Sequence, residues 1–451
     1  MKLTLIKPNI GRLEHSLYVD EGRMEPLQIG VLAGLTPTGV DVAFHDDRCE
    51  SIPFDDPTDL VAITVETFTA RRAYEISAEY RARGVPVVLG GFHPTLIPEE
   101  AAEHADSIVL GDAETVWEDV IGDAREGSLK PVYRSRGIAP QAGGLFPRRD
   151  IFKGKGYLPL TLAQFGRGCV NECLYCAINV FFERTHTFRP VEEVVREIEE
   201  QRMKVVFFVD DNIVADHEAA KELFRALIPL RIRWVSQGSI DMVQDRELMD
   251  LMVESGCLGN VIGFESIDPD VLREMNKAPN LEGFDAYERE IEILKTYGLQ
   301  TWAAFLLGHD SDTRDGLYET LDFALRHKFT FAAYNILMPY PKTPLYRKLE
   351  AEGRLLYDGK WWLHPEYRFN YAAFRPATMT ADELTEIAFD IRRRWNSRGS
   401  ILRRFFDPRT NMRSPYRAFI YWAYNPLFQK ETFKKQGMRF GVSREGAPHC
   451  Q

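Results

Sequence analysis

Three cysteines in one short stretch of this chain have the spacing of metal ligands. Cys169, Cys173 and Cys176 form a C-x3-C-x2-C pattern in the sequence GRGCVNECLYC at positions 166–176. Three thiolates this close together can bind one metal centre while a tight loop surrounds it. A structural zinc site needs four ligands, and His186, which follows further along the chain, has no partner at zinc-finger spacing. The pattern therefore favours a 4Fe–4S cluster with one iron open to an exogenous ligand, and it leaves zinc as the alternative.

The segment that carries the cysteines begins a series of alternating strand and helix patterns. Apolar strand patterns lie at 161–166, 204–210, 232–237, 260–266, 299–308 and 329–339. Helical patterns lie between them at 191–201, 217–227, 246–255, 283–297 and 316–326. This repetition over 161–345 predicts a partial (β/α)6 barrel, whose chemistry is expected at the C-terminal ends of its strands. The cysteines follow the first of these strands, so the metal centre is expected at that end.

The first 125 residues predict a separate α/β domain. Apolar strand patterns lie at 2–8, 40–46, 60–66, 86–91 and 107–112, with helical patterns at 70–83 and 98–104. Nearly continuous apolar strands separated by helices indicate a doubly wound parallel sheet. Ligands of such sheets bind beyond the carboxyl ends of the strands, which here are followed by 66–69, 90–95 and 111–114. No G-x-G-x-x-G fingerprint follows the first strand, which argues against a dinucleotide.

Two further segments complete the predicted organisation. Residues 126–160 are rich in Gly, Pro and Arg without a clear periodicity, and we interpret them as a linker. Residues 346–451 are helical and irregular, and they end in a basic tail. The chain is thus predicted to be an α/β protein with a Rossmann-like domain, a linker, a partial barrel and a helical C-terminal region.

The composition places the chain among soluble globular proteins. It has 45% hydrophobic and 27% charged residues, and no stretch approaches the roughly 20 apolar residues of a membrane span. The N-terminus lacks the apolar region of a secretory signal. Six cysteines are too few for a disulfide scaffold, so we expect a reducing, cytoplasmic location and interpret Cys49, Cys257 and Cys450 as bystanders. The net charge of −11 argues against a general nucleic-acid binder.

The basic tail departs from this acidic average. Residues 392–444 contain fourteen Lys or Arg and only two acids, Asp407 and Glu431. Aromatic residues are interleaved with these cations: Phe405, Phe406, Phe419, Tyr421, Trp422, Tyr424 and Phe428. One interpretation is docking on an anionic membrane surface or on an acidic partner, which would make the protein peripheral at the inner membrane face. The other is a helical segment packed on the acidic body, with arginine stems covering apolar surface.

The motifs together resemble the radical S-adenosylmethionine (radical SAM) superfamily, in the subfamily with an N-terminal cobalamin-binding domain. The C-x3-C-x2-C loop with Tyr175 before its last cysteine carries the resemblance to the superfamily. The resemblance to the subfamily rests on six segments and covers most of the chain. These segments are TFTARRAYEIS (67–77), GGFHPTLIPEEA (90–101), GDAE (111–114), VDDN (209–212), GFES (263–266) and MPYPKTPLY (338–346).

The resemblance implies roles for particular residues. The three cysteines would ligate three irons, and the amino and carboxylate groups of S-adenosylmethionine would chelate the fourth. One electron from the reduced cluster, supplied by a donor such as flavodoxin or ferredoxin, would cleave the sulfonium to methionine and a 5′-deoxyadenosyl radical. Tyr175 would pack near the adenine. The residues at later strand ends would contact the cofactor or the substrate: Asp210, Asn212, Glu265, Ser266 and Gly308, with Glu265 and Asp210 as the catalytic candidates.

Two residues of this list have a structural alternative, and a third residue departs from the pattern of the subfamily. Asp210 and Asn212 would equally suit the cap of a helix that begins near Asp216. His309 departs from the glycine-proline turn that the subfamily usually has after the fifth strand, and it faces either the substrate or solvent.

Cobalamin binding by the first domain is implied more weakly. The residues that would line the site are Thr67, Gly90, Gly91 and His93. Many cobalamin domains ligate cobalt through a D-x-H-x-x-G histidine after the second strand, but this chain has HDDR at 45–48. His93 is the only histidine placed to approach a corrin. Members of the subfamily often leave the lower cobalt face unligated, so both cobalamin binding and a relic domain remain open, and we favour binding.

The reaction that the resemblance favours is cobalamin-dependent methylation of an unactivated carbon. The small-molecule substrate would be a lipid or isoprenoid, or a natural-product intermediate, and an aromatic set (Trp361, Trp362, Tyr367, Phe369 and Tyr371) would suit the mouth of its site. Radical cyclisation, rearrangement and sulfur insertion are alternatives within the family. A cluster or corrin redox sensor without turnover is the alternative from another functional class.

Overall fold

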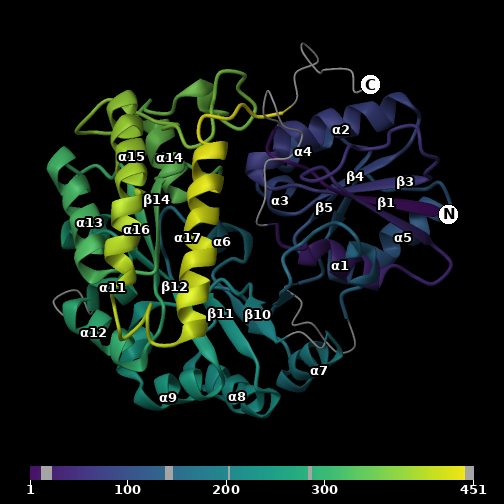
Figure 1. Cartoon of the computed structure of the whole chain (residues 1–451). Coiled ribbons are helices and arrows are strands. Elements are labelled where there is room, and N and C mark those ends of the chain that lie inside the picture. The colour runs from purple at the N-terminus through teal and green to yellow at the C-terminus, as the bar shows by residue number, and fades with distance from the viewer. Residues whose placement is uncertain (12–22, 138–145, 202–203, 283–286, 442–451) are drawn as a thin grey trace. The chain divides into compact units, whose positions relative to one another are not determined.

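The computed structural model describes residues 1–11, 23–137, 146–201, 204–282 and 287–441, which belong to two compact units (Figure 1). Unit 1 consists of Met1–Leu158, Leu356–Phe369 and Glu431–Gln451. Unit 2 consists of Pro159–Leu355 and Asn370–Lys430. The chain therefore returns to unit 1 twice after it has entered unit 2, and the predicted C-terminal region is divided between the two units.

Unit 1 is built on a six-stranded sheet in the order β2-β1-β3-β4-β5-β6, and all its strand pairs are parallel. Its strands are β1 (Lys2–Lys7), β2 (Asp41–Asp46), β3 (Leu60–Thr64), β4 (Val87–Gly90), β5 (Ser107–Leu110) and β6 (Val132–Arg134). Its helices are α1 (Leu27–Leu35), α2 (Ala70–Ala82), α3 (Phe92–Leu96), α4 (Pro98–Glu103) and α5 (Trp117–Arg125). The predicted doubly wound parallel sheet is confirmed, and its strand order changes direction at β1 and β3.

The structure differs from the prediction in the segment 126–160. Three of its residues form β6, which pairs with β5 and extends the sheet. A strand this short has a single buried residue, Tyr133, between two exposed ones, so it leaves no readable alternation in the sequence. Phe152, also in this segment, belongs to the hydrophobic core of unit 1.

Unit 2 is built on a second six-stranded parallel sheet, in the order β14-β13-β12-β11-β10-β7. Its strands are β7 (Thr161–Ala163), β10 (Val205–Phe208), β11 (Arg233–Gln237), β12 (Cys257–Glu265), β13 (Trp302–Leu307) and β14 (Phe331–Ile336). The helices that connect these strands are α7 (Val191–Gln201), α8 (His217–Leu227), α9 (Arg246–Glu254), α10 (Pro269–Glu274), α11 (Ala278–Glu282), α12 (Tyr287–Tyr297) and α13 (Arg314–His327). Each strand pairs with the next one along the chain, which confirms the predicted partial barrel.

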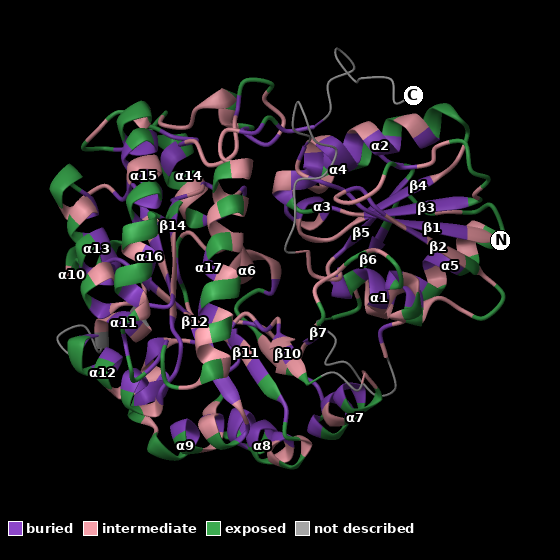
Figure 2. Ribbon diagram, viewed as in Figure 1, coloured by how far each residue is buried: buried purple, intermediate pink, exposed green. Residues whose placement is uncertain are grey.

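Local sequence signals explain where these helices start. Asp216 and Asp245 precede α8 and α9, and each carboxylate accepts a hydrogen bond from a backbone N–H in the first turn. Thr313 does the same for α13. Such caps satisfy N–H groups that have no partner within the helix. The apolar faces of these helices and the sheet share one core, and Figure 2 shows the strands of both sheets as largely buried.

The rest of the chain after β14 is mostly helical. Its helices are α14 (Pro344–Ala351), α15 (Ala381–Trp395), α16 (Arg398–Phe405) and α17 (Pro415–Lys435). No helix in the described part of the chain is long and apolar enough to cross a membrane. Between α14 and α15 the chain supplies the segment Leu356–Phe369 to unit 1.

The aromatic residues of that segment form part of the interior of unit 1. Trp361, Trp362 and Tyr367 are fully buried. The Trp361 ring packs against Phe68 and Phe440, with ring centroids 5.0 and 6.3 Å apart. This corrects the expectation that these residues line the mouth of a substrate site, because side chains buried this completely offer no surface to a ligand.

Candidate active site

The three cysteines lie in the segment that connects the two strands of a short antiparallel pair in unit 2. The pair consists of β8 (Gly166–Gly168) and β9 (His186–Phe188), and α6 (Ala177–Phe181) begins directly after the last cysteine. Cys173 is buried, and Cys169 and Cys176 are half-buried. All three thiols are free of disulfide bonds. The loop therefore presents three thiols of one short segment at the end of the barrel where the first strand, β7, emerges.

Backbone hydrogen bonds hold this loop to two other parts of unit 2. Leu174 donates its N–H to the carbonyl of Met275 at 3.0 Å, and Leu345 donates to the carbonyl of Leu174 at 3.1 Å. Within the loop, the Cys176 N–H donates to the carbonyl of Cys173 at 3.2 Å. The positions of the thiols are thus fixed before any ligand binds.

The donor set fits a cluster better than a single ion. In the part of the chain that the structure describes, no three His, Cys, Asp or Glu side chains converge closely enough to hold one metal ion. An iron–sulfur cluster is larger, and each cysteine thiolate binds it separately. Burial raises the pKa of the Cys173 thiol and raises that of Cys176 to about 11. Because only thiolates are ligands, binding of a metal centre must displace these protons.

Tyr175, Glu265 and Lys277 form a partly buried polar group beside the cysteines. The Tyr175 hydroxyl donates to Glu265 Oε1 at 2.9 Å, and Lys277 Nζ lies 3.0 Å from the same oxygen. Burial lowers the pKa of Lys277, but the negative charges of Glu265, Cys173 and Cys176 outweigh this and raise it. Lys277 is thus a half-buried cation whose field acts on two of the three thiols.

The backbone around Glu265 is shaped for this arrangement. Glu265 ends β12 with a φ of +62°, a conformation that is uncommon for residues other than glycine. The register with β13 shifts between Gly263 and Glu265, and a Cβ atom at position 263 would overlap the Glu265 carboxylate. Strained backbone of this kind recurs at functional sites.

The predicted residues Asp210 and Asn212 hold backbone rather than facing a ligand. Asp210 accepts the N–H of Phe165 at 3.0 Å and the N–H of Gly166 at 2.5 Å. Asn212 Oδ1 accepts the N–H of Ser239 at 3.2 Å. Asp210 is fully buried with both carboxylate oxygens occupied, so its observed position differs from the expected catalytic one. Neither residue caps α8, because Asp216 does so.

Asp210 and its neighbour Asp211 position the segment that leads into the cysteine loop. Asp211 accepts the N–H of Gly168 at 2.9 Å, directly before Cys169. Burial raises the pKa of Asp210 to about 7 and that of Asp211 to about 6. Two carboxyl groups after β10 thus hold the β8 backbone in place.

Three further residues lie at the carboxyl ends of β12 and β13. Ser266 is buried, and its hydroxyl accepts the N–H of Asp268 at 3.0 Å. Gly308, with a φ of +108°, donates its N–H to Asp312 at 2.7 Å. His309 is buried, burial lowers its pKa to about 4, and its Nε2 has no hydrogen-bond partner among the described residues. His309 therefore does not face solvent, which was one of its two interpretations.

In unit 1 the candidate cobalamin residues lie after β3 and β4. Thr67 is buried in the turn after β3. Gly91 has a φ of +104°, and a Cβ there would meet the carbonyl of Val65 at 3.0 Å. A Cβ at Gly90 would make only an ordinary contact with Val109. The close approach of neighbouring backbone thus accounts for Gly91 without a ligand.

His93 follows the carboxyl end of β4, but its side chain lies in the interior of unit 1. Its side chain is 0% exposed, and its Nε2 lies 3.1 Å from Glu100 Oε1. The same oxygen accepts the Trp362 indole N–H at 2.9 Å, and Lys360 Nζ lies 3.1 Å from Oε2. Burial alone would raise the pKa of Glu100. Hydrogen bonds from His93, Trp362 and Lys360 outweigh this effect and lower that pKa to about 2. This buried network differs from the expected approach of His93 to a corrin.

Comparison with known proteins agrees with this site. A family model described as "Radical SAM superfamily" matches residues 163–324. Bacteriochlorophyllide d C-8(2)-methyltransferase of Chlorobaculum tepidum is 30% identical over 365 residues, which are 74% of this chain and 78% of that protein. The chain belongs to the radical SAM superfamily.

Two more relatives extend the likeness of this radical SAM protein to most of its length. Bacteriochlorophyllide d C-12(1)-methyltransferase of the same organism is 29% identical over 416 residues, 89% of each chain. The radical S-adenosylmethionine methyltransferase TsrM of Kitasatospora setae, solved with cobalamin and a [4Fe-4S] cluster, superposes with a TM-score of 0.61 at 18% identity. That match covers 78% of this chain and 75% of TsrM. The likeness to TsrM shows a shared fold.

Membership in the radical SAM superfamily confirms the prediction that the chain is an enzyme. The matched segment includes all three cysteines as well as Glu265 and Lys277. Membership in the family confirms S-adenosylmethionine and a 4Fe–4S cluster as cofactors of the chain, and the three cysteines stay the predicted ligands of the cluster. Lys277 was missed in the sequence because it lies outside every recognised motif, although it is only twelve positions after Glu265.

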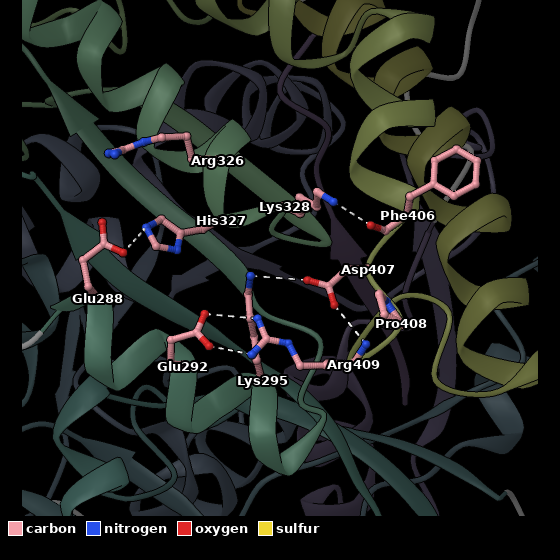
Figure 3. Close-up of a pocket in the computed structure, with 10 residues that line it drawn as sticks. All are labelled: Glu288, Glu292, Lys295, Arg326, His327, Lys328, Phe406, Asp407, Pro408 and Arg409. Atoms are coloured by element: carbon pink, nitrogen blue, oxygen red, sulfur yellow. Dashed lines mark hydrogen bonds and ion pairs between the residues drawn. The ribbon is translucent and has the colours of Figure 1, made fainter.

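A further pocket of about 410 Å3 lies on unit 2 of this radical SAM protein, between α12, α13 and the segment after α16 (Figure 3). Most of its charged groups are paired with one another. His327 Nε2 lies 3.1 Å from Glu288, and Lys295 Nζ lies 3.3 Å from Asp407. Because these charged side chains pair with each other, the pocket offers a ligand few unpaired charged groups.

Proposed function

We propose that this radical SAM enzyme methylates an unactivated carbon of a hydrophobic small molecule and uses cobalamin as the methyl carrier. The observation that carries the proposal is the loop of three free cysteines beside the partly buried Glu265–Lys277 pair, at the carboxyl ends of the barrel strands. This loop leaves one iron of a cluster without a protein ligand. The second support is the likeness to two methyltransferases over most of the chain.

At the cysteine loop, Cys169, Cys173 and Cys176 would hold the cluster. When bound, the cluster supplies the electron that cleaves S-adenosylmethionine reductively to a 5′-deoxyadenosyl radical. The backbone bonds of Leu174 and the carboxylate of Asp211 keep the loop in one conformation. Lys277 would offset part of the negative charge that three thiolates bring into a buried site.

The strand ends around the loop would exclude water from the reacting groups. Ser266 and His309 are buried there, and the Tyr175–Glu265 hydrogen bond is partly buried. A radical intermediate requires such exclusion of stray hydrogen donors. The unpartnered Nε2 of His309 would accept a hydrogen bond from the substrate, because burial keeps the imidazole neutral.

In unit 1 the segments after β3, β4 and β5 would hold cobalamin at the carboxyl edge of the sheet. When bound, cobalamin supplies a methyl group carried on cobalt. The topology fits, because doubly wound sheets bind ligands at this edge. Three histidines described in residues 1–158 do not fit a ligand for cobalt: His93 is buried on Glu100, His104 stacks on Tyr74 at 3.9 Å, and His45 lies 3.8 Å from Glu50. The corrin would be held without any of these three histidines.

The substrate class follows from the relatives. Two of them are named for methylation of bacteriochlorophyllide d, and one of these matches 89% of this chain. We therefore favour a hydrophobic ring system, such as a tetrapyrrole, among the lipid and natural-product candidates. The methyl acceptor would be an unactivated carbon on its periphery.

The test is an anaerobic assay of the full chain. The protein is reconstituted with iron and sulfide, with and without hydroxocobalamin, reduced, and given S-adenosylmethionine and bacteriochlorophyllide d. We expect 5′-deoxyadenosine in both samples, and S-adenosylhomocysteine with a methylated product only with cobalamin. 5′-Deoxyadenosine without S-adenosylhomocysteine or a methylated product, in both samples, would indicate cyclisation, rearrangement or insertion in place of methyl transfer. An intact cluster without any 5′-deoxyadenosine would favour a sensor.

A cysteine variant provides the control for the site. Replacing Cys169, Cys173 or Cys176 by Ala should remove the cluster iron and abolish 5′-deoxyadenosine. Cys49→Ala, in unit 1, should leave both unchanged. Full activity of a variant that lacks all three loop cysteines would contradict the assignment.

A further inference from the structure

Helix α17 presents an apolar face to solvent. Phe419 and Trp422 are 64% and 43% exposed, and Pro426 is exposed on the same side of the helix. Tyr421 and Asn425 of the same helix are buried. A helix on the surface of a globular protein normally places its apolar residues inward. On α17, which lies toward the viewer in Figure 2, large apolar residues are instead exposed to solvent.

Helix α16 extends the apolar face. The Tyr421 hydroxyl donates to the carbonyl of Ile401 at 2.6 Å, which holds α16 beside α17. Leu402 and Phe406 are 50% and 54% exposed. In Figure 3 the Phe406 ring points away from the pocket, while its carbonyl accepts the ammonium of Lys328 at 2.6 Å. We call the four exposed residues Leu402, Phe406, Phe419 and Trp422 the α16–α17 face.

The charges within residues 396–430 are nearly all positive. Residues 396–430 contain seven Lys or Arg and a single acid, Asp407, which is buried. Arg398 and Arg403 on α16 are exposed, and neither has an acidic partner in the described part of the chain. The face therefore combines exposed aromatic and aliphatic side chains with exposed cations, and no exposed acid lies within these residues.

We propose that the α16–α17 face docks on the surface of an anionic phospholipid bilayer. Aromatic and aliphatic side chains bury at the boundary between headgroups and acyl chains, and arginines attract anionic headgroups. A second copy of the chain fits less well, because a two-fold contact through this face would bring Arg398 and Arg403 of both copies together. This docking is a property of unit 2 and goes beyond the proposed reaction.

The test is flotation of the full chain with lipid vesicles. One set contains phosphatidylcholine alone, and the other contains phosphatidylcholine with 30% phosphatidylglycerol. We expect binding to the anionic vesicles that weakens as salt is raised. Phe419→Ser with Trp422→Ser should weaken this binding at least tenfold, because it removes buried apolar area. Arg398→Gln with Arg403→Gln should weaken it about fivefold for each arginine.

Matched variants separate docking from general effects. Phe419→Leu with Trp422→Leu keeps the apolar character and should retain most of the binding. Arg225→Gln with Arg246→Gln removes the same charge from exposed positions on α8 and α9 and should leave binding unchanged. Equal losses in both arginine pairs, or equal binding to neutral and anionic vesicles, would overturn the proposal. So would a dimer in solution that becomes a monomer only in the serine variant.

Discussion

Lys277 Nζ lies 3.0 Å from the Glu265 oxygen that also accepts the Tyr175 hydroxyl. The lysine belongs to the turn after α10, and the glutamate ends β12, so two separate elements place a cation and an anion beside the cysteine loop. The negative charges of Glu265, Cys173 and Cys176 raise the pKa of Lys277, so it is charged throughout the physiological range. A fixed positive charge at this place stabilises whichever cluster state is more negative.

Removal of that charge should make the cluster harder to reduce. In Lys277→Gln we expect the midpoint potential to fall by on the order of 50–100 mV, because a unit charge several ångströms away acts through an effective dielectric of about 20. Lys277→Arg should stay close to the original potential. An anaerobic redox titration followed by electron paramagnetic resonance measures the shift. An unchanged potential in Lys277→Gln would show that the lysine serves only the fold.

Asp210 should make stability fall as pH rises from about 4 to about 7. Burial raises its pKa to about 7, so between its unfolded and folded pKa values the folded protein holds a proton that the unfolded chain has lost. Stability therefore decreases with pH in that window. Asp210→Asn removes this dependence, so the gap in unfolding free energy between the variant and the original protein should be larger at pH 5 than at pH 8. Urea unfolding at both pH values measures it, and an equal gap would contradict the assignment.

Cobalamin bound to unit 1 should carry no protein histidine on cobalt. The imidazole of His93 is engaged by Glu100 inside the unit. We expect the paramagnetic resonance spectrum of the cob(II)alamin form to be identical whether the histidines carry 14N or 15N. His93→Gln should leave this spectrum unchanged and should lower the stability of unit 1 by about 1–3 kcal/mol, through loss of a buried hydrogen bond. A nitrogen splitting that changes with the label would assign a histidine ligand.

His309 should affect methyl transfer more than cleavage of S-adenosylmethionine. Its buried Nε2, at the carboxyl end of β13, lacks a hydrogen-bond partner among the described residues. Burial of an unpartnered polar atom costs free energy, and a hydrogen bond from the substrate would remove that cost. In His309→Phe we expect the ratio of methylated product to 5′-deoxyadenosine to fall about tenfold, since a buried hydrogen bond is worth about 1 kcal/mol or more. Because burial lowers the pKa of His309 to about 4, this ratio should not vary through His309 between pH 6 and 8. Mass spectrometry of both products gives the ratio, and an unaltered ratio in the variant would exclude contact with the substrate.

The sequence was sufficient for most of the fold because long apolar runs mark buried parallel strands. β1, β3 and β13 are such runs, and the spacing of Cys169, Cys173 and Cys176 carries the site by itself. The short strands β6 and β8 were not predicted, because three residues are too few to show a period.

The roles of single polar residues depended on partners that no pattern reveals. Asp210 follows a strand in the way that a catalytic residue would, but its carboxylate is occupied by the backbone of Phe165 and Gly166. His93 is buried because Trp362 and Lys360, far along the chain, complete the network around Glu100. Lys277 becomes notable only when its distance to Glu265 is known.

The two late segments of unit 1 have a consequence for synthesis of the protein. Phe68 packs against Trp361 and Phe440, so the core of the unit that is translated first contains residues translated among the last. During translation, the first unit cannot complete its core until the whole of unit 2 has left the ribosome. A fragment that ends after Leu158, or a chain shortened before Phe440, should therefore expose aromatic surface and depend on chaperones.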